Sequence, residues 1–236
     1  MTPRERLRDI TALLKPSILW LSVLMAGLGL WLAPGELGFW RSFFMLLGTG
    51  LIVGSANALN MVMEIDVDAR MRRTKHRPLP AGRMKVGTAV AVGIFTGFGA
   101  TATLYLSSNL LTALLGYGAL VAYVLIYTPL KRKTPQALLV GAVPGAMPPL
   151  MGWTAVTGQV DAPGLVLFGI LMLWQLPHFI AIAVYRKHDY ATAGFKTVPV
   201  VRGVEAAKWQ TLAYSTLLIP LSMALTPLGA TGWVYG

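Results

Sequence analysis

The feature that most constrains this chain is a series of long apolar segments separated by short polar ones. A helix of roughly 20 apolar residues crosses the hydrocarbon core of a bilayer, which is about 30 Å thick. Backbone polar groups cannot stay unpaired in lipid, so such segments are predicted to be helices. The seven predicted spans are residues 17–33, 43–63, 86–107, 110–127, 137–156, 165–185 and 212–228. The predicted fold class is all-α, a polytopic transmembrane helix bundle.

Composition supports this class. The chain is 55% hydrophobic and only 12% charged, whereas a soluble domain carries about 25% charged residues. A lipid bilayer is therefore the expected environment. We find no linker, low-complexity tract or tandem repeat, so residues 1–236 are predicted to form a single membrane domain. There are no cysteines, which excludes disulfides and thiolate metal sites.

Basic residues mark one side of the predicted bundle. Of the 20 Lys and Arg residues, 19 lie in the leader 1–15 and the loops 64–85, 128–136 and 186–208, and only Arg41 lies on the other side. The positive-inside rule places these segments in the cytoplasm, and the membrane is predicted to be the cell inner membrane. Topology thus accounts for the net charge of +11, and we expect no nucleic-acid partner.

The end of the second span carries a pattern of oxygen donors. Asn60, Glu64 and Asp68 are spaced at i, i+4 and i+8, so a helix would place them on one face. Two carboxylates and an amide oxygen suit Mg²⁺, which fills its remaining positions with water and phosphate oxygens. Asp66 is out of phase with this face. It is either a partner for Arg70 at i+4 or a further ligand reached through loop curvature.

A basic run follows these acids directly. Carboxylates, a metal ion and guanidinium groups together are typical of a diphosphate site. Topology and lipid headgroup contact are the alternative explanation, which suffices for residues 131–133, although Lys131 stays a candidate. The candidate diphosphate-binding residues are Arg72, Arg73, Lys75, Arg77, Lys131 and Arg186.

A second polar segment follows the sixth span. Asp189 is either a further metal ligand or a surface acid paired with a neighbouring cation such as Arg186. His178 lies within the span after Pro177, and ionisable residues inside spans are functional candidates by default. It either contacts a haem group or hydrogen-bonds a carbonyl freed by Pro177. Residues 141–149 of the fifth span are rich in Gly and Pro, which predicts an interrupted span beside a pocket.

The quoted segments together resemble the haem-farnesylating branch of the UbiA prenyltransferase superfamily. The likeness covers residues 15–203, with Asn60, Glu64 and Asp68 matching the branch's first acidic motif. RRTKHRPLPAGR, KRKTPQ, PGAMPP, PHF and YRKHDYATAG match further stretches in the correct order. At the second motif Tyr185 stands four positions before Asp189, where the superfamily often has an acid. The family bundle usually has nine helices, so a truncated or unusually short member is expected.

The resemblance implies the function. Mg²⁺, held by Asn60, Glu64, Asp68 and Asp189, would grip farnesyl diphosphate, and a vinyl group of haem B would accept the farnesyl group to give haem O. Haem B is then a substrate, and a haem A synthase is an expected partner. One alternative is another UbiA-type prenyltransferase acting on a quinone precursor. A second is a membrane transporter, although transporters place ionisable residues near the middle of the bilayer.

Overall fold

The computed structural model describes residues 2–232 of the chain. In these residues the chain forms helices and no strands, so the predicted all-helical class is confirmed. The helices, in chain order, are α1 (Pro3–Leu14), α2 (Pro16–Leu32), α3 (Phe39–Met63), α4 (Ile65–Arg70), α5 (Val86–Ser107), α6 (Leu110–Val121), the π-helix η1 (Ala122–Tyr127), α7 (Thr128–Leu130), α8 (Ala137–Thr157), α9 (Ala162–Tyr185), α10 (Lys187–Ala193), α11 (Val198–Val201) and α12 (Gly203–Met223).

Five helical runs are long and apolar enough to cross a membrane, namely α3, α5, the continuous run Leu110–Leu130, α8 and α9. Helices α1 and α2 meet at a bend of 50° and give a sixth if they are taken as one span. The prediction of seven spans is therefore slightly too high. Helix α2 alone has only 17 residues, and α12 carries Glu205 and Lys208 in its first turns.

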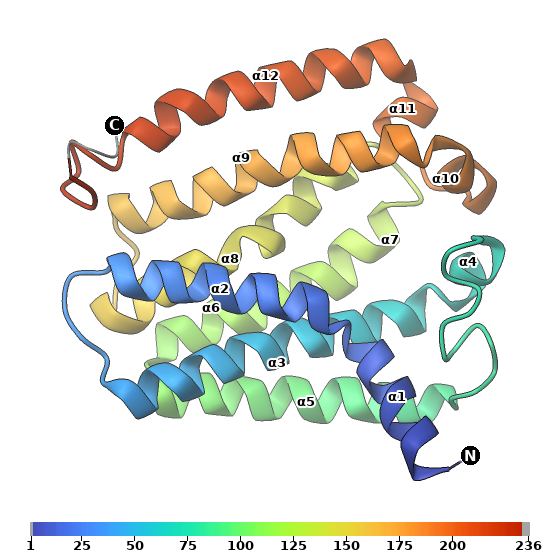
Figure 1. The fold of residues 1–236 in the computed structure, drawn as a ribbon, viewed down its shortest axis with the longest axis horizontal. Coiled ribbons are helices and arrows are strands. Elements are labelled where there is room, and N and C mark those ends of the chain that lie inside the picture. The colour runs from blue at the N-terminus through green and yellow to red at the C-terminus, as the bar shows by residue number, and fades with distance from the viewer. Residues whose placement is uncertain (1, 233–236) are drawn as a thin grey trace.

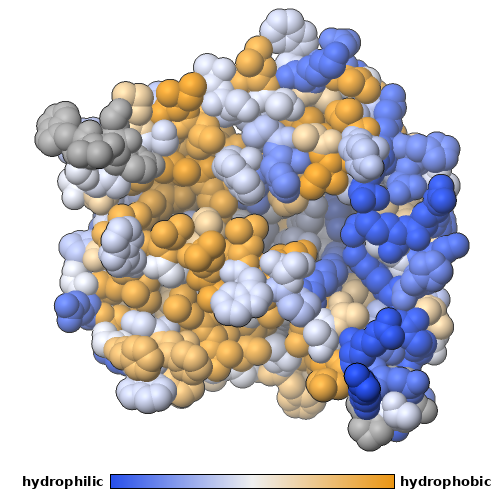
Figure 2. Space-filling model, in the orientation of Figure 1, coloured by the Kyte–Doolittle hydropathy of each residue, from blue (hydrophilic) through white to orange (hydrophobic). Residues whose placement is uncertain are grey.

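The long helices lie side by side, and the polar connections gather at one end (Figure 1). Helices α4, α10, α11 and the start of α1 lie at the right of this view, and the hydrophilic surface forms a band at the same end in Figure 2. The rest of the visible face is largely apolar. We call this end the polar end. The chain is a multi-pass membrane protein.

Small residues allow the closest helix contacts. Gly29 of α2 faces the backbone of Pro149, and Gly152 of α8 faces the backbone of Ala26, so that α2 and α8 approach closely. The hydroxyl of Ser55 on α3 donates to the carbonyl of Gly93 on α5, 2.7 Å away. Small residues at such contacts are typical of helix packing in membranes, where no hydrophobic effect drives helices together.

Three details differ from the sequence-based expectations. The region 186–208 was predicted to be a loop, but it contains α10, α11 and the start of α12. Residues 128–130, also predicted as loop, continue the helical run. Helix α8 is continuous although it contains Pro144, Pro148 and Pro149, so the predicted interruption of the fifth span is wrong. Its carbonyl at Ala142 accepts a hydrogen bond of 2.8 Å from buried Gln175 of α9.

Candidate active site

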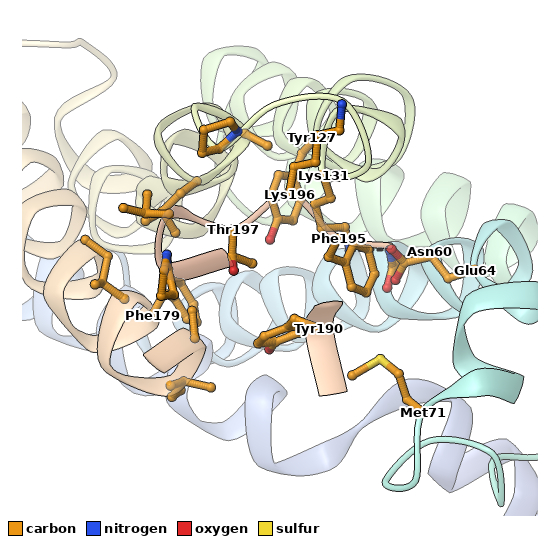
Figure 3. A pocket seen from close by; sticks show the side chains of 18 of the residues that line it. Asn60, Glu64, Met71, Tyr127, Lys131, Phe179, Tyr190, Phe195, Lys196 and Thr197 are labelled. Carbon is orange, nitrogen blue, oxygen red and sulfur yellow. Dashed lines mark ion pairs between the residues drawn. The ribbon is translucent and has the colours of Figure 1, made fainter. Parts of the chain in front are cut away.

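A cavity of about 270 Å³ opens at the polar end of the bundle. Its lining comes from α3, α4, η1, the beginning of α8, α9, the segment 190–199 and the connections at residues 15, 71–77 and 131–135. Figure 2 shows a hollow where the apolar and polar surfaces meet. In Figure 3, Asn60 and Glu64 lie on one side of the cavity and Phe179 and Thr197 on the other, with Tyr190 and Phe195 between them. The proline-rich centre of α8 does not line it.

The three predicted oxygen donors line this cavity together. Asn60, Glu64 and Asp68 are 2%, 5% and 3% exposed. Helix α3 ends before Glu64, whose backbone leaves helical geometry. The i to i+4 hydrogen bonds nevertheless continue, from Glu64 N to Asn60 O at 3.1 Å and from Asp68 N to Glu64 O at 2.7 Å. The predicted spacing therefore survives the helix break and keeps the three side chains on one wall.

Each of the two carboxylates has a cationic partner. Lys131 Nζ lies 2.7 Å from Glu64 Oε1, and Arg77 Nη1 lies 2.7 Å from Asp68 Oδ2. Lys131 also lies over the rings of Tyr127 and Phe195, at 4.8 Å and 5.6 Å from their centroids. Cation–π contacts of this kind hold an ammonium group in place. The cations are thus ordered beside the acids, within reach of an anion in the cavity.

Further cations face the cavity. Lys15, Arg73 and Lys196 also line it. Burial, together with the nearby charges of Arg77 and Lys131, lowers the pKa of the Lys15 ammonium to about 7. The pKa falls because desolvation and like charge both disfavour the protonated form. A bound anion would have the opposite effect, so the lining is suited to a multiply charged anion such as a diphosphate.

Solved structures share this architecture. A UbiA homologue from Archaeoglobus fulgidus, described as bound to DMAPP and Mg²⁺, matches with a TM-score of 0.79 and 19% identity over 96% of this chain and 80% of that one. An apo UbiA homologue from Aeropyrum pernix gives a TM-score of 0.79 at 19% identity over 94% of this chain and 82% of that one. At such low identity these likenesses show the fold alone.

Residues 20–236 match the sequence family described as the UbiA prenyltransferase family. The chain belongs to this family. Among curated UbiA-family relatives, a protoheme IX farnesyltransferase of Anaeromyxobacter dehalogenans is 50% identical over 99% of this chain and 79% of its own length. A protoheme IX farnesyltransferase of Myxococcus xanthus is 48% identical over 96% of this chain and 77% of its own length. These findings confirm the resemblance inferred from the sequence.

Not every predicted site residue of this UbiA-family chain lies at the cavity. Of the six candidate diphosphate-binding residues, Arg73, Arg77 and Lys131 line it, whereas Arg72, Lys75 and Arg186 do not. Asp189 is also absent from the lining, and its carboxylate lies 3.8 Å from Arg186. The surface interpretation of Asp189 therefore has a partner in the structure.

Two other candidates are not part of the cavity lining. His178 is exposed on α9, where its ring stacks on that of Trp174 with centroids 5.2 Å apart. Asp66 accepts two hydrogen bonds from Arg132, of 3.0 Å and 2.8 Å, and lies 3.7 Å from Arg70. The hydrogen bonds from Arg132 hold the pKa of Asp66 below its usual value. Asp66 is thus a structural ion-pair partner, with Arg132 as its main contact.

Several lining residues were not identified from the sequence, namely Lys15, Tyr123, Tyr127, Tyr190, Phe195, Lys196 and Thr197. A signal existed for two of them. Tyr123, Tyr127 and Lys131 are spaced at i, i+4 and i+8, which is also the spacing of the three oxygen donors. This run lies opposite those donors, where Lys131 contacts Glu64. Lys196 is placed by tertiary structure, because its backbone N–H donates to the carbonyl of Lys131 at 3.1 Å.

The donor set suits a hard divalent cation. In residues 2–232 no group of three or more His, Cys, Asp and Glu side chains could hold a metal ion. Glu64 and Asp68 are two carboxylates, however, and the Asn60 amide adds a third oxygen beside them. Magnesium needs only one or two protein carboxylates when phosphate oxygens complete its coordination. These residues therefore fit Mg²⁺ bound together with a diphosphate better than Mg²⁺ bound alone.

Proposed function

We propose that this chain transfers a farnesyl group from farnesyl diphosphate to a vinyl group of haem B, giving haem O. One observation carries the chemistry: a buried wall of Asn60, Glu64 and Asp68 faces a cavity lined by ordered cations. The acceptor is supported by curated relatives of up to 50% identity that are named protoheme IX farnesyltransferases. The same relatives favour haem over a quinone precursor.

In this proposal Asn60, Glu64 and Asp68 hold Mg²⁺. When bound, the ion would supply positive charge that stabilises the charge of the leaving diphosphate. A structural neighbour named as bound to DMAPP and Mg²⁺ favours a metal-dependent prenyl transfer, and the choice of ligands is our own proposal. The ligand set predicted from the sequence also contained Asp189. Because Asp189 is not part of the lining, we centre the site on the other three.

The cations of the chain carry the other half of the site. Arg73, Arg77, Lys15, Lys131 and Lys196 line the cavity and would neutralise the diphosphate. As the bond between C1 and oxygen breaks, its electron pair goes to the diphosphate. Cations that already line the cavity would stabilise this charge without reorganising, which is the main source of electrostatic catalysis.

The apolar part of the lining would take the hydrocarbon chain. Leu138, Phe179, Ile180, Ala183 and Val198 contribute to it. This part, which includes Phe179, lies across the cavity from Asn60 and Glu64. It would exclude water from the allylic cation that forms at C1. The haem vinyl group then supplies the electron pair for the new carbon–carbon bond, and water adds to the resulting cation with loss of a proton. The product is the hydroxyethylfarnesyl group.

The proposed membrane location and orientation rest on the basic residues of the polar end. We propose that the polar end faces the cytoplasm and that the bundle spans the cell inner membrane, because 19 of 20 basic residues lie in segments of this end. Farnesyl diphosphate would then enter from the cytoplasmic side. The predicted partnership with a haem A synthase stays a prediction.

The experiment is an assay of the purified chain in lipid with haem B, farnesyl diphosphate and Mg²⁺, followed by mass spectrometry. Haem O should form, disappear with chelator and return with Mg²⁺. Prenylation of an aromatic quinone precursor in a parallel reaction, without haem O, would support another UbiA-type prenyltransferase. Movement of labelled substrate into vesicles without any prenylated product would support the transporter.

A further inference from the structure

Asn60 has a buried hydrogen-bond partner behind the cavity wall. Its side-chain Nδ2 lies 3.0 Å from Oγ1 of Thr128, the first residue of α7. Thr128 is 2% exposed and is not among the residues that line the cavity. It therefore cannot touch a ligand there directly, and any influence on the site must act through Asn60.

The hydroxyl of Thr128 is already committed as a donor. Its Oγ1 lies 2.9 Å from the carbonyl oxygen of Tyr123. A carbonyl oxygen can only accept, and a hydroxyl has a single proton. The Thr128 oxygen must therefore accept from Asn60, so the NH₂ of the carboxamide faces Thr128. These two hydrogen bonds fix the orientation of the amide and leave Oδ1 available on the side of the cavity.

The π-helix η1 produces this arrangement. In a π-helix the hydrogen bond spans five residues, and the backbone N–H of Thr128 accordingly donates to the carbonyl of Tyr123. The same carbonyl receives both the backbone N–H and the hydroxyl of Thr128. The wider turn thus holds the hydroxyl beside α3, at Asn60. Single π-turns within helices are frequent at functional sites.

We propose that Thr128 is a positioning residue that holds the Asn60 carboxamide with its oxygen toward the metal and diphosphate. The inference rests on the proposed function, because it needs Asn60 to be a ligand. Without the Thr128 hydroxyl, the amide loses its fixed orientation and can present NH₂ to a cation, which repels it. The expected consequence is weaker binding of Mg²⁺ together with the diphosphate, while the fold is kept.

The test measures binding rather than turnover. The probe is farnesyl S-thiolodiphosphate, an analogue with a poor leaving group, titrated with Mg²⁺ against the full chain in detergent. Thr128→Val removes the hydroxyl at nearly constant shape and should raise the Mg²⁺ concentration for half-maximal binding about 10-fold, which equals about 1.4 kcal/mol. Thr128→Ser keeps the hydroxyl and should stay within about 2-fold of the unmodified chain.

Two comparisons separate positioning from general damage. Thr112→Val is the matched control, because Thr112 is a buried threonine on α6 whose hydroxyl pairs with that of Thr154 at 2.9 Å. It should leave the Mg²⁺ dependence unchanged. Asn60→Asp gives the side chain two equivalent oxygens, so orientation no longer matters. In that background Thr128→Val should add less than about 2-fold, a non-additivity typical of directly coupled residues.

Specific results would overturn the proposal. These are unchanged Mg²⁺ dependence in Thr128→Val, the same loss in Thr128→Ser, or the same loss in Thr112→Val. A full additional 10-fold effect in the Asn60→Asp background would also contradict it. Failure of the proposed function looks different, because the unmodified chain itself would then bind no analogue with Mg²⁺ and make no haem O.

Discussion

Asp9 and Arg83, 74 positions apart in the sequence, form an ion pair between α1 and the loop 71–85, in which the carboxylate is buried and the guanidinium is partly exposed. Arg83 Nε and Nη2 lie 3.1 to 3.3 Å from the carboxylate oxygens, and Asp9 is only 4% exposed. The same guanidinium donates to the carbonyl of His76 at 3.1 Å. His76 precedes Arg77, the partner of Asp68. The first helix thus anchors the loop that carries a cation to the site.

We expect Asp9→Asn to loosen this loop. The substitution weakens charge-assisted hydrogen bonds that contribute about 1–3 kcal/mol. Trypsin cleavage between residues 72 and 77 should therefore become about 10-fold faster, since local opening controls access. Limited proteolysis followed by mass spectrometry checks this. Glu205→Gln is the control, because it breaks the exposed Glu205–Lys208 pair. Equal cleavage of both variants would show that Asp9 does not anchor the loop.

The wall of oxygen donors gives a second prediction. Asp68 is 3% exposed and faces the cavity, so Asp68→Asn should lower haem O formation at least about 100-fold by removing a charged ligand. Asp66→Asn is the matched control in the same short helix. Its carboxylate is 51% exposed and binds Arg132, so formation should stay within about 3-fold. Initial rates at saturating Mg²⁺ measure both, and a larger loss in Asp66→Asn would contradict the site.

The local part of this site could be predicted from the sequence because it follows helical periodicity. Asn60, Glu64 and Asp68 repeat every four residues, and their i to i+4 hydrogen bonds persist across the break at Glu64. The long apolar segments predicted the class for a similar reason, since length and hydrophobicity act within each segment. Features that depend on one segment alone were therefore accessible.

Features that depend on tertiary contacts could not be predicted from the sequence. Lys15 reaches the cavity because the chain bends between α1 and α2, and Lys196 because its N–H binds the carbonyl of Lys131. Neither residue has a local pattern that reports this. Asp189 is the opposite case, a residue predicted to be at the site that does not line the cavity. Its sequence neighbourhood does not reveal which way the short helix α10 points. The prolines of α8 were also misleading, since packing against neighbouring helices keeps α8 continuous.

Thr197 provides a third prediction. Its Oγ1 is buried and, within the described part of the chain, has no hydrogen-bond partner, although the residue lines the cavity. An unpaired buried hydroxyl is unfavourable for folding. Thr197→Val should therefore leave the free energy of unfolding unchanged or raise it by up to about 1 kcal/mol. If the hydroxyl serves a substrate, KM for farnesyl diphosphate or haem should rise about 5-fold, as the loss of one hydrogen bond requires.

Thermal unfolding and steady-state kinetics on the same Thr197→Val preparation separate these effects. Val198 is the neighbouring control, because it lines the cavity without a polar group. Val198→Ile should affect packing without changing hydrogen bonding. A loss of stability in Thr197→Val with unchanged KM would assign the hydroxyl a structural role, contrary to this prediction.

The contact between α2 and α8 gives the last prediction. A methyl group at Gly152 would clash with the backbone carbonyl of Ala26, and backbone atoms cannot rotate away as a side chain can. Gly152→Ala should therefore force the helices apart and destabilise the fold by about 3 kcal/mol. A methyl group added at Gly99 on α5 would meet no atom within 4 Å, so Gly99→Ala should stabilise its helix by up to about 1 kcal/mol. In thermal unfolding in detergent, the midpoint temperature of Gly152→Ala should be roughly 6–12 °C lower than that of the unmodified chain. The midpoint of Gly99→Ala should be equal or slightly higher. Equal midpoints for the two variants would mean that close approach of α2 and α8 does not hold the bundle together.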